Sequence, residues 1–426
     1  MDIYEEHLDE AAFLWLQWER ALLSPAHDLR ETVELEERLL AHLDGLVLGG
    51  APVARALLRP ALESEEPPRI SSALWALLAE PTDLELTELV TLLKTLPGEL
   101  LGAAQRALEL SGREGIGEAL LPLLKETDAS LQALALEVFA SRAEVPKGSV
   151  VEWLQHADAR VVVAALRGMH HRPQELDPRM LSSLLVEKRP GIAEAAIEAG
   201  LVAGLRTAWD ECRKVVGGRV GIGRLPMALL ALSGDDRDIQ SLLECVGRAE
   251  LRADALWALG FSGQIGAAEA CLELMADESL AGEAFSAITG LRLEEPYVAP
   301  RQDEEESLPP LEEDLAEDLE HRPESELRMP KREAVAAWWQ DARKEFTRGT
   351  RYLRGRVFSI EGLLEELEQG PMRRRHVHAL ELAIRSRGAC MLQTRAFSDR
   401  QRAGLEQARA MKTRLTASPL SQLFGR

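Results

Sequence analysis

LQALALEVFA at residues 131–140, VVVAALRGMH at 161–170 and IAEAAIEAGL at 192–201 are three segments of one pattern, rich in alanine and leucine. The pattern continues as PMALLALSG at 226–234, ADALWALGFSG at 253–263 and GEAFSAITG at 282–290. Most of these segments run into a glycine, and Gly168, Gly200, Gly234, Gly260 and Gly290 are 32, 34, 26 and 30 residues apart. This spacing is typical of one helix pair per repeat, so the sequence predicts an all-α fold built as an α-solenoid, a superhelical array of antiparallel helix pairs.

The composition agrees with a helical repeat array. The chain has 426 residues, too many for one compact core, and it is 46% apolar but only 4% aromatic. Alanine and leucine supply most of the apolar content, and both favour helix. Runs of β-branched residues bounded by turns are nearly absent, so no sheet is expected.

Breaks in the pattern divide the chain into four parts. Between Asp303 and Glu320 there are ten Asp or Glu residues and no Lys or Arg, with prolines in and beside this stretch. Such a segment buries too little apolar surface to order itself. The predicted parts are an N-terminal helical cap at 1–45, repeats at 46–292, an acidic proline-rich linker at 293–330, and a basic helical C-terminal module at 331–426.

Charge separates the last part from the rest. The net charge is −21, but residues 1–330 hold 30 Lys and Arg against 61 Asp and Glu, whereas residues 331–426 hold 20 against 10. The long acidic part should repel nucleic acid, and the basic module could attract either an external polyanion or its own acidic neighbour. Tethering makes the local concentration of that neighbour high, so we expect the module to dock intramolecularly.

The sequence predicts a cytoplasmic protein. The four cysteines, Cys212, Cys245, Cys271 and Cys390, form no CxxC pair, so we expect buried thiols in a reducing compartment and neither a disulfide framework nor a zinc site. The N-terminus MDIYEEHLDE has no secretory pattern. No apolar run is long enough to cross a bilayer, so membrane insertion is not expected.

The sharpest local cluster lies in the C-terminal module. Trp338 and Trp339 are adjacent, and on a helix two adjacent side chains point about 100° apart, so burying both needs two covering surfaces. Arg351, Tyr352 and Arg354 follow. Trp, Tyr and Arg dominate binding energy at interfaces, so these residues are predicted to bind a partner, and the alternative is the core of a small helical module. Docking onto the repeats would satisfy both interpretations.

Two other sets of residues are candidates for ligand contacts. Arg373, Arg374 and Arg375 stand at a helix start, where positive charge opposes the helix dipole, and an acidic partner would relieve that cost. The second set is a glycine-rich loop whose backbone N–H groups and arginines could hold an anion. It comprises Gly217, Gly218, Arg219, Gly221, Gly223 and Arg224. The loop lacks the P-loop pattern, so a turn between helices is the alternative.

Nothing in the sequence predicts catalysis, a metal or a cofactor. There is no GxSxG and no HExxH motif, and the serines and cysteines lack an adjacent histidine. His376-Val377-His378 with Glu381 puts His378 and Glu381 at i, i+3, but this set and the pair His170-His171 have too few converging ligands for a metal, so we expect surface or capping histidines. The expected class is therefore a protein that is not an enzyme.

The chain resembles a proteobacterial family of HEAT-repeat proteins of unassigned function. ADALWALGFSG and AFSAITGL resemble bacterial HEAT-type repeats, and AAWWQDARKEFTRGTRYLRGRVF and MRRRHVHALELAI are similar to the end of that family. The matching residues are Trp338, Trp339, Gly349, Arg351, Tyr352, Leu353 and Gly355. His376-Val377-His378 replaces smaller residues. Members are often encoded among type VI secretion components, which implies effector loading or immunity, and the family offers no catalytic residues.

Taken together, the sequence predicts a scaffold or adaptor that binds a protein on the concave face of a HEAT-like solenoid. The predicted partner is basic. An acidic array would steer a basic partner and enforce selectivity. The first alternative is nucleic-acid binding through the basic module, as in HEAT-like DNA glycosylases, although the acidic array argues against it. The second is a lyase-like modifier or regulator of a partner protein, for which no site is apparent.

Overall fold

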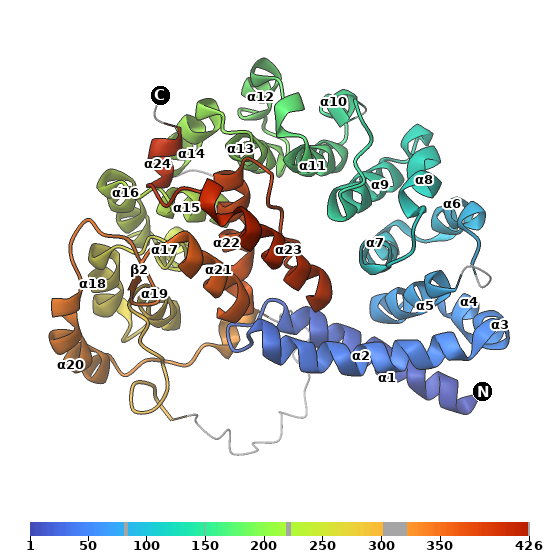
Figure 1. The fold of residues 1–426 in the computed structure, drawn as a ribbon, viewed down its shortest axis with the longest axis horizontal. Coiled ribbons are helices and arrows are strands. Elements are labelled where there is room, and N and C mark those ends of the chain that lie inside the picture. Colours follow the sequence, from blue (N-terminus) through green and yellow to red (C-terminus); the bar gives the residue numbers. More distant parts are fainter. Residues whose placement is uncertain (81–83, 149, 219–222, 301–321, 425–426) are drawn as a thin grey trace. The chain divides into compact units, whose positions relative to one another are not determined.

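The computed structural model describes residues 1–80, 84–148, 150–218, 223–300 and 322–424, and it confirms the all-α class (Figure 1). The chain forms two compact units. The first unit contains Met1–Leu23, His27–Glu211 and Leu364–Thr416. The second contains Ser24–Ala26, Cys212–Leu363 and Ala417–Arg426. The segment 331–426 therefore contributes to both units, and most of the predicted linker, residues 301–321, lies outside the described residues.

The helices of the first unit follow one another with short connections. They are α1 (Asp2–Ala21), α2 (Leu29–Leu48), α3 (Gly50–Val53), α4 (Arg59–Ala61), α5 (Pro67–Ala79), α6 (Leu86–Thr95), α7 (Leu101–Leu110), α8 (Ile116–Leu120), α9 (Ala129–Arg142), α10 (Val150–Trp153), α11 (Ala159–Gly168), α12 (Pro178–Leu184), α13 (Ile192–Val202), α22 (Met372–Ser386) and α23 (Ser398–Met411). Two of the boundaries between the units along the chain fall within helices, one in α14 (Arg206–Gly218) and one in α21 (Ile360–Gln369).

Alternate helices of the first unit pack side by side in a row. Contacts run from α1 to α5, α7, α9, α11 and α13 in turn. The shorter helices form a second layer, in which α6 contacts α8, α10 contacts α11 and α12 contacts α13. Close approach needs small residues at the contacts: a Cβ on Gly200 would lie 2.5 Å from the Cβ of Ala208. The row buries a continuous apolar core that no single helix pair could provide.

Aspartate side chains cap the N-termini of several of these helices. Asp28 caps α2, and Glu31 completes a capping box by accepting from the Asp28 backbone N–H. Asp128, Asp158 and Asp177 cap α9, α11 and α12 in the same way. A carboxylate at this position satisfies N–H groups that have no partner inside the helix and interacts favourably with the helix dipole. These caps fix where each helix of the row begins.

Residues 364–416 return to the first unit. Figure 1 shows α5, α7, α9, α11 and α13 in a curved row, with α22 and α23 on its inner side. Helix α22 packs on α13, and α23 packs on α2. The arginine-rich stretch after residue 395 forms α23, and the basic triplet 373–375 lies in the first turn of α22. We call the side of α7, α9, α11 and α13 that faces α22 and residues 391–400 the inner surface.

The second unit repeats the two-layer packing. Its helices are α15 (Arg224–Ala231), α16 (Asp236–Val246), α17 (Ala249–Leu259), α18 (Ile265–Leu274), α19 (Ser279–Thr289), α20 (Arg332–Ala342) and α24 (Leu420–Leu423). Helices α15, α17 and α19 pack in order, α16 and α18 cover them, and α20 packs on α18. Trp257 and Phe285 are almost fully buried in this core. All four cysteines are free and buried, as predicted.

The expectation that no sheet forms is wrong at one short hairpin. No sheet was expected, but β1 (Tyr352–Leu353) and β2 (Arg356–Val357) form a two-stranded antiparallel hairpin. Arg354 and Gly355 both have positive φ, which closes a two-residue turn. Two residue pairs are too short a ladder to leave a periodic hydrophobic signal in the sequence. The predicted cap on the following helix is confirmed, because the Ser359 hydroxyl accepts from the Gly362 N–H at 3.0 Å.

Candidate functional site

The predicted tryptophan pair lies in an aromatic cluster of the second unit. Trp339 is buried and Trp338 is half-buried, and their ring centroids lie 6.1 Å apart. The ring of Phe285 on α19 lies 5.4 Å from that of Trp339. Phe346 continues the cluster to Tyr352, at 5.2 and 4.7 Å. These aromatic surfaces cover one another within the unit, and their binding of an external partner stays a prediction.

The hairpin after this cluster is held by the turns of the repeat helices. The Tyr352 N–H donates to the Gly263 carbonyl at 2.8 Å, and the Arg354 N–H donates to the Ala287 carbonyl at 2.9 Å. The Arg351 guanidinium carbon lies 3.9 Å from the ring centre of Phe358. Arg351, Tyr352 and Arg354 therefore all belong to a hairpin that packs on the end of α19 and the turn before α18.

The basic triplet lies inside the first unit and is not a surface patch. Arg373, Arg374 and Arg375 are only 4%, 2% and 0% exposed. The Arg375 guanidinium donates to the Leu367 carbonyl and to Gln401 Oε1, both at 2.6 Å. Burial lowers the pKa of Arg375 to about 10, against the opposing effect of Asp28. Nucleic-acid phosphates cannot reach side chains that are covered in this way.

The glycine-rich loop falls partly outside the described residues, which omit 219–222. Gly217 and Gly218 end α14, and Gly223 precedes α15. Arg224 forms ion pairs with Asp254 at 2.9 Å and Glu324 at 2.7 Å, and it lies over the Trp257 ring. Its charge is thus engaged inside the second unit. The anion-binding hypothesis for this loop stays a prediction.

Segment 391–400 lies across the first unit in the manner of a bound peptide. Residues 391–397 form no helix, and α23 begins at Ser398. The Phe397 ring lies 5.0 Å from Trp18 and 6.3 Å from Trp75, measured between centroids. Glu36 accepts the Ser398 backbone N–H at 2.9 Å and the hydroxyl at 2.6 Å. The ring contacts of Phe397 and the buried hydrogen bonds of Ser398 to Glu36 thus hold this non-helical stretch of chain in place.

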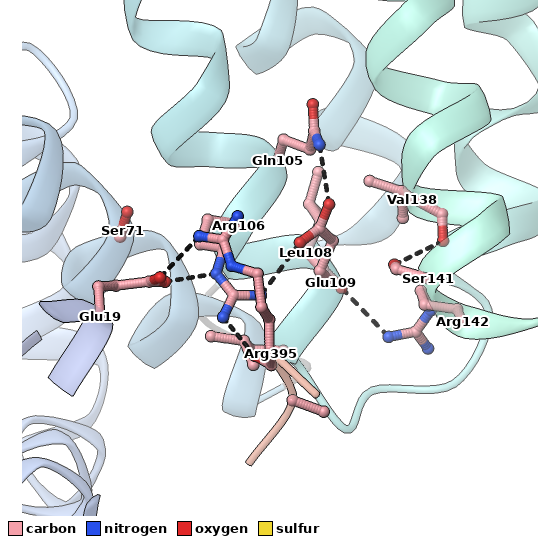
Figure 2. Close-up of polar contacts among 12 residues, drawn as sticks. Glu19, Ser71, Gln105, Arg106, Leu108, Glu109, Val138, Ser141, Arg142 and Arg395 are labelled. Carbon is pink, nitrogen blue, oxygen red and sulfur yellow. Dashed lines mark hydrogen bonds and ion pairs between the residues drawn. The ribbon is translucent and has the colours of Figure 1, made fainter. Parts of the chain in front are cut away.

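Arginines add charged contacts along the same segment (Figure 2). Arg106 on α7 contacts Glu19, donates to the Arg395 carbonyl, and pairs with Glu109 at 3.1 Å. Arg395 pairs with Glu19 at 2.7 Å. Arg400 donates to the carbonyls of Glu109, Leu110 and Ser111 at 2.7–2.9 Å, where α7 ends and its carbonyls lack helical partners.

A charged pocket of about 430 Å³ opens beside this segment on the inner surface. Its walls come from α7, α9, α11, the turn after α11, α13, α22 and residues 391–400. Its charged and imidazole side chains are Arg106, Glu109, Glu137, Arg167, His170, His171, Glu198, His376, Arg395 and Arg400. Alanine and leucine side chains of α9, α22 and the segment complete the lining. A volume of this size is typical of ligand sites.

Two ionisable groups on opposite walls of the charged pocket have strongly shifted pKa values. His170 is 6% exposed, and its Nδ1 lies 3.7 Å from Glu198 Oε1. Burial, helped by the charge of Arg167, lowers the pKa of His170 to about 4. Burial raises the pKa of Glu198 to about 7, and Arg167 opposes the rise. At neutral pH the imidazole is uncharged and Glu198 exchanges its proton readily.

The neighbouring groups shift in the same directions. Glu137 pairs with Arg167 at 2.5 Å, yet burial together with Glu109 and Glu198 raises the pKa of Glu137. Burial lowers the pKa of His171, whose Nε2 lies 2.7 Å from the Ala140 carbonyl. Desolvation of charges is what moves these values, and clusters of shifted groups in a cavity are typical of functional sites.

The sequence interpretation missed this pocket. Histidines were expected at the surface or at helix caps, which is wrong for His170. A signal was present: Arg106, Glu137, Arg167 and Glu198 are 31, 30 and 31 residues apart, so charges of alternating sign recur at the repeat spacing. Equivalent positions of stacked helix pairs point to one surface. A series of charges at such positions, on helices that are otherwise apolar, therefore indicates where that surface lies.

A second, larger hollow of about 760 Å³ lies between residues 121–125 and α10. Its polar residues Lys125, Glu152 and Gln155 are exposed. Trp153 and the aliphatic residues Leu121 and Leu124 form its apolar part. It brings together no buried ionisable groups from separate repeats, so the charged pocket is the better candidate site.

Within the ranges that the structure describes, no group of three or more His, Cys, Asp or Glu side chains is arranged to hold a metal ion. None of the helices in those ranges is both long and apolar enough to cross a membrane. The side chains of the charged pocket can exchange protons and form ion pairs.

Comparison with known proteins assigns no family to this chain. No protein-family model matches it, and no curated protein matches it. Among solved structures, an engineered protein from the Northeast Structural Genomics Consortium is similar over 98% of this chain and 97% of its own. The two sequences are 16% identical and the TM-score is 0.29, so this likeness supports no argument about fold or function.

Proposed function

We propose that this chain is a HEAT-like α-solenoid that works as a non-enzymatic scaffold and binds a protein partner on its inner surface. The two-layer packing of successive helices in each unit supports the solenoid. The observation that carries the binding role is the docking of segment 391–400. That segment is non-helical up to Phe397, with a turn at residues 393–396, and it is held by aromatic, ionic and backbone contacts from helices far away in the sequence.

The chemistry of those contacts describes the partner. Phe397 packs against tryptophans, and Arg395 and Arg400 contact a carboxylate and helix-terminal carbonyls. A surface with these partners recognises basic and aromatic side chains, both of which contribute strongly to protein interfaces. We therefore propose a partner with an extended basic segment, which also agrees with the acidic balance of residues 1–330.

The finer assignment comes from the resemblance of residues 336–358 and 372–384 to the proteobacterial HEAT-repeat proteins. We propose on that basis that the cytoplasmic partner belongs to type VI secretion, in effector handling or immunity. Nucleic-acid binding is the weaker alternative, because the basic triplet 373–375 is buried. No observation favours a lyase-like activity.

Capture of partners from native cytosol tests the proposal. The bait is the full chain, compared with Arg167→Ala and Arg160→Ala, two substitutions on α11. Arg167 lines the charged pocket with a side chain 54% exposed, and Arg160 is similarly exposed at 62% but lies outside the pocket. We expect a defined protein to bind the wild type and Arg160→Ala equally, and Arg167→Ala several times more tightly, because that substitution removes a positive charge beside the basic segment and frees Glu137.

Failure has two forms. Capture of no protein, or equal capture by all three baits, would contradict binding on the inner surface. A captured protein with no connection to secretion effectors or their immunity proteins would remove only the type VI assignment.

A further inference from the structure

We propose that the charged pocket binds an aliphatic cation, an ammonium or guanidinium group on a hydrocarbon chain, held between Glu198, Glu137 and His170. The proposal rests on the proposed function in one respect, because the source we favour is a Lys or Arg side chain of the protein partner. A free alkylamine has the same chemistry and is distinguished by the experiment below.

The arginines of the pocket are already engaged, which argues against an anionic ligand. Arg106 uses all three guanidinium nitrogens on Glu19, Glu109 and the Arg395 carbonyl. Arg400 uses two nitrogens on the carbonyls at the end of α7. Arg167 is held by Glu137 and is half exposed, so solvent screens its charge. The remaining capacity for hydrogen bonds is therefore on the acidic side chains.

Glu198 supplies that capacity. Over the described residues, neither of its oxygens accepts a hydrogen bond, and its Oε1 lies 3.7 Å from Nδ1 of His170, which is uncharged at neutral pH. Glu137 accepts from Arg167 through Oε1 only. The charge of Glu198 raises the pKa of Glu137, and a cation that lies between two carboxylates stabilises their ionised forms. Glu198 is 24% exposed, so solvent and a ligand can reach it.

His170 provides the second, independent indication of a ligand. Its Nε2 is buried and has no hydrogen-bond partner in the described part of the chain, although the residue is 94% buried. With the proton on Nδ1, toward Glu198, the Nε2 lone pair is an acceptor that lacks a donor. A buried polar atom without a partner costs about 1–3 kcal/mol. An N–H of an ammonium or guanidinium group would supply the missing donor.

The rest of the lining suits a hydrocarbon chain. Ala140, Ala379, Leu380, Ala383 and Leu392 line the same cavity and are buried. Pockets that combine an apolar wall with a few converging polar groups orient a ligand by one end. The charged and titratable groups that surround the proposed cation are Arg106, Glu109, Glu137, Arg167, His170, His171, Glu198, His376, Arg395 and Arg400.

Isothermal titration of the full chain with agmatine tests the proposal. Butylurea, which keeps the four-carbon chain and a planar N–H group but lacks both positive charges of agmatine, is the comparison ligand. We expect agmatine to bind at pH 8 at least about tenfold more tightly than butylurea. Affinity should fall severalfold at pH 6, and binding should release a proton, seen as a heat that varies with the ionisation enthalpy of the buffer, because Glu198 must be ionised.

Two variants of α13 locate the site. Glu198→Gln should weaken agmatine binding at least about tenfold and abolish the proton release, whereas Glu194→Gln, one turn earlier and outside the pocket lining, should bind like the wild type. Circular dichroism of both variants checks that they are folded. Equal binding of agmatine and butylurea, or unchanged binding by Glu198→Gln, would overturn the proposal.

The source of the cation is decided by a peptide. Acetyl-Gly-Gly-Arg-Gly-Gly-amide that binds at least as tightly as agmatine supports a protein side chain, and agmatine binding without peptide binding overturns that source. The outcomes also separate this proposal from the proposed function. Capture of a partner with the expected effect of Arg167→Ala, but without agmatine binding, removes only the cation site. Agmatine binding through Glu198 without any captured protein removes only the scaffold role.

Discussion

Glu36 on α2 and Ser398 at the start of α23 are 362 residues apart in the sequence, yet both Glu36 carboxylate oxygens lie 2.9 Å from the Ser398 backbone nitrogen. Both residues are buried. The carboxylate therefore does for α23 what the capping aspartates do for α9, α11 and α12, but from a distant helix. This contact ties the end of the chain to the N-terminal helices of the first unit.

Replacing Glu36 should loosen that attachment. Glu36→Ala removes the acceptor for two buried donors and the negative charge at the N-terminus of α23, so we expect a loss of about 1–3 kcal/mol of unfolding free energy. Urea unfolding followed by circular dichroism measures it. Glu37→Ala, the exposed neighbour on α2, is the control and should change little. Equal stability of the two variants would show that the contact contributes nothing.

Phe397→Ala should release segment 391–400 from the inner surface. The substitution removes the ring contacts with Trp18 and Trp75, at a cost of about 3–5 kcal/mol if the site were fully buried and less here, because Phe397 is only partly covered. Trypsin should then cleave after Arg395 and Arg400 at least several times faster than in the wild type. Phe13→Ala, which changes an exposed phenylalanine, should leave the cleavage rate unchanged.

The pH dependence of stability should reflect Glu198 and His170 in opposite senses. The pKa of Glu198 is raised from 4.5 to about 7, so stability is lost as the pH rises through this range, by up to about 1.4 kcal/mol per pH unit. The pKa of His170 is lowered from 6.5 to about 4, so stability is lost as the pH falls through that range. Between 4.5 and 6.5 the two effects partly cancel.

Glu198→Gln separates the two effects. The variant keeps the shape of the protonated acid and cannot ionise, so it should be more stable than the wild type at pH 8 and equal to it near pH 4.5. Chemical unfolding at both values measures the difference. A variant that is less stable than the wild type at pH 8 would mean that the Glu198 carboxylate is stabilised by the fold, contrary to the raised pKa.

Gly290→Ala should destabilise the second unit. Gly290 has a φ of +77°, and a Cβ there would lie 2.5 Å from the Arg354 carbonyl oxygen, against the hairpin turn. We expect a loss of about 1–3 kcal/mol, measured by thermal unfolding. Gly266→Ala is the matched control, since that glycine lies in α18 with open space around it. There the change should be neutral or stabilising by up to about 1 kcal/mol.

The sequence was most informative where local physics decides structure. The all-α class follows from the alanine and leucine content, which favours helix over a few neighbouring positions, and it is confirmed. The hairpin at residues 352–357 was missed because its strands are held by carbonyls of α19 and of the turn before α18, not by a pattern of their own.

Much less of the candidate site than of the fold could be predicted from the sequence. Arg373, Arg374 and Arg375 were predicted to contact an acidic partner, because positive charge at a helix start opposes the helix dipole. Only the packed structure buries them, with contacts such as that of Arg375 to Gln401. His170 and Glu198 are 28 residues apart and face one pocket because the helices that carry them are stacked, and neither residue is unusual in its own segment.

By itself, the sequence determined the helices, because alanine and leucine content, capping residues and turn breaks act over a few neighbouring positions. It also determined a periodic spacing that places like positions on one side. Only the tertiary structure decided which charges become buried, that segment 391–400 lies on the inner surface, and that Glu198 and His170 meet across a pocket. Desolvation and long-range contacts depend on how distant segments are brought together, and no local pattern encodes that.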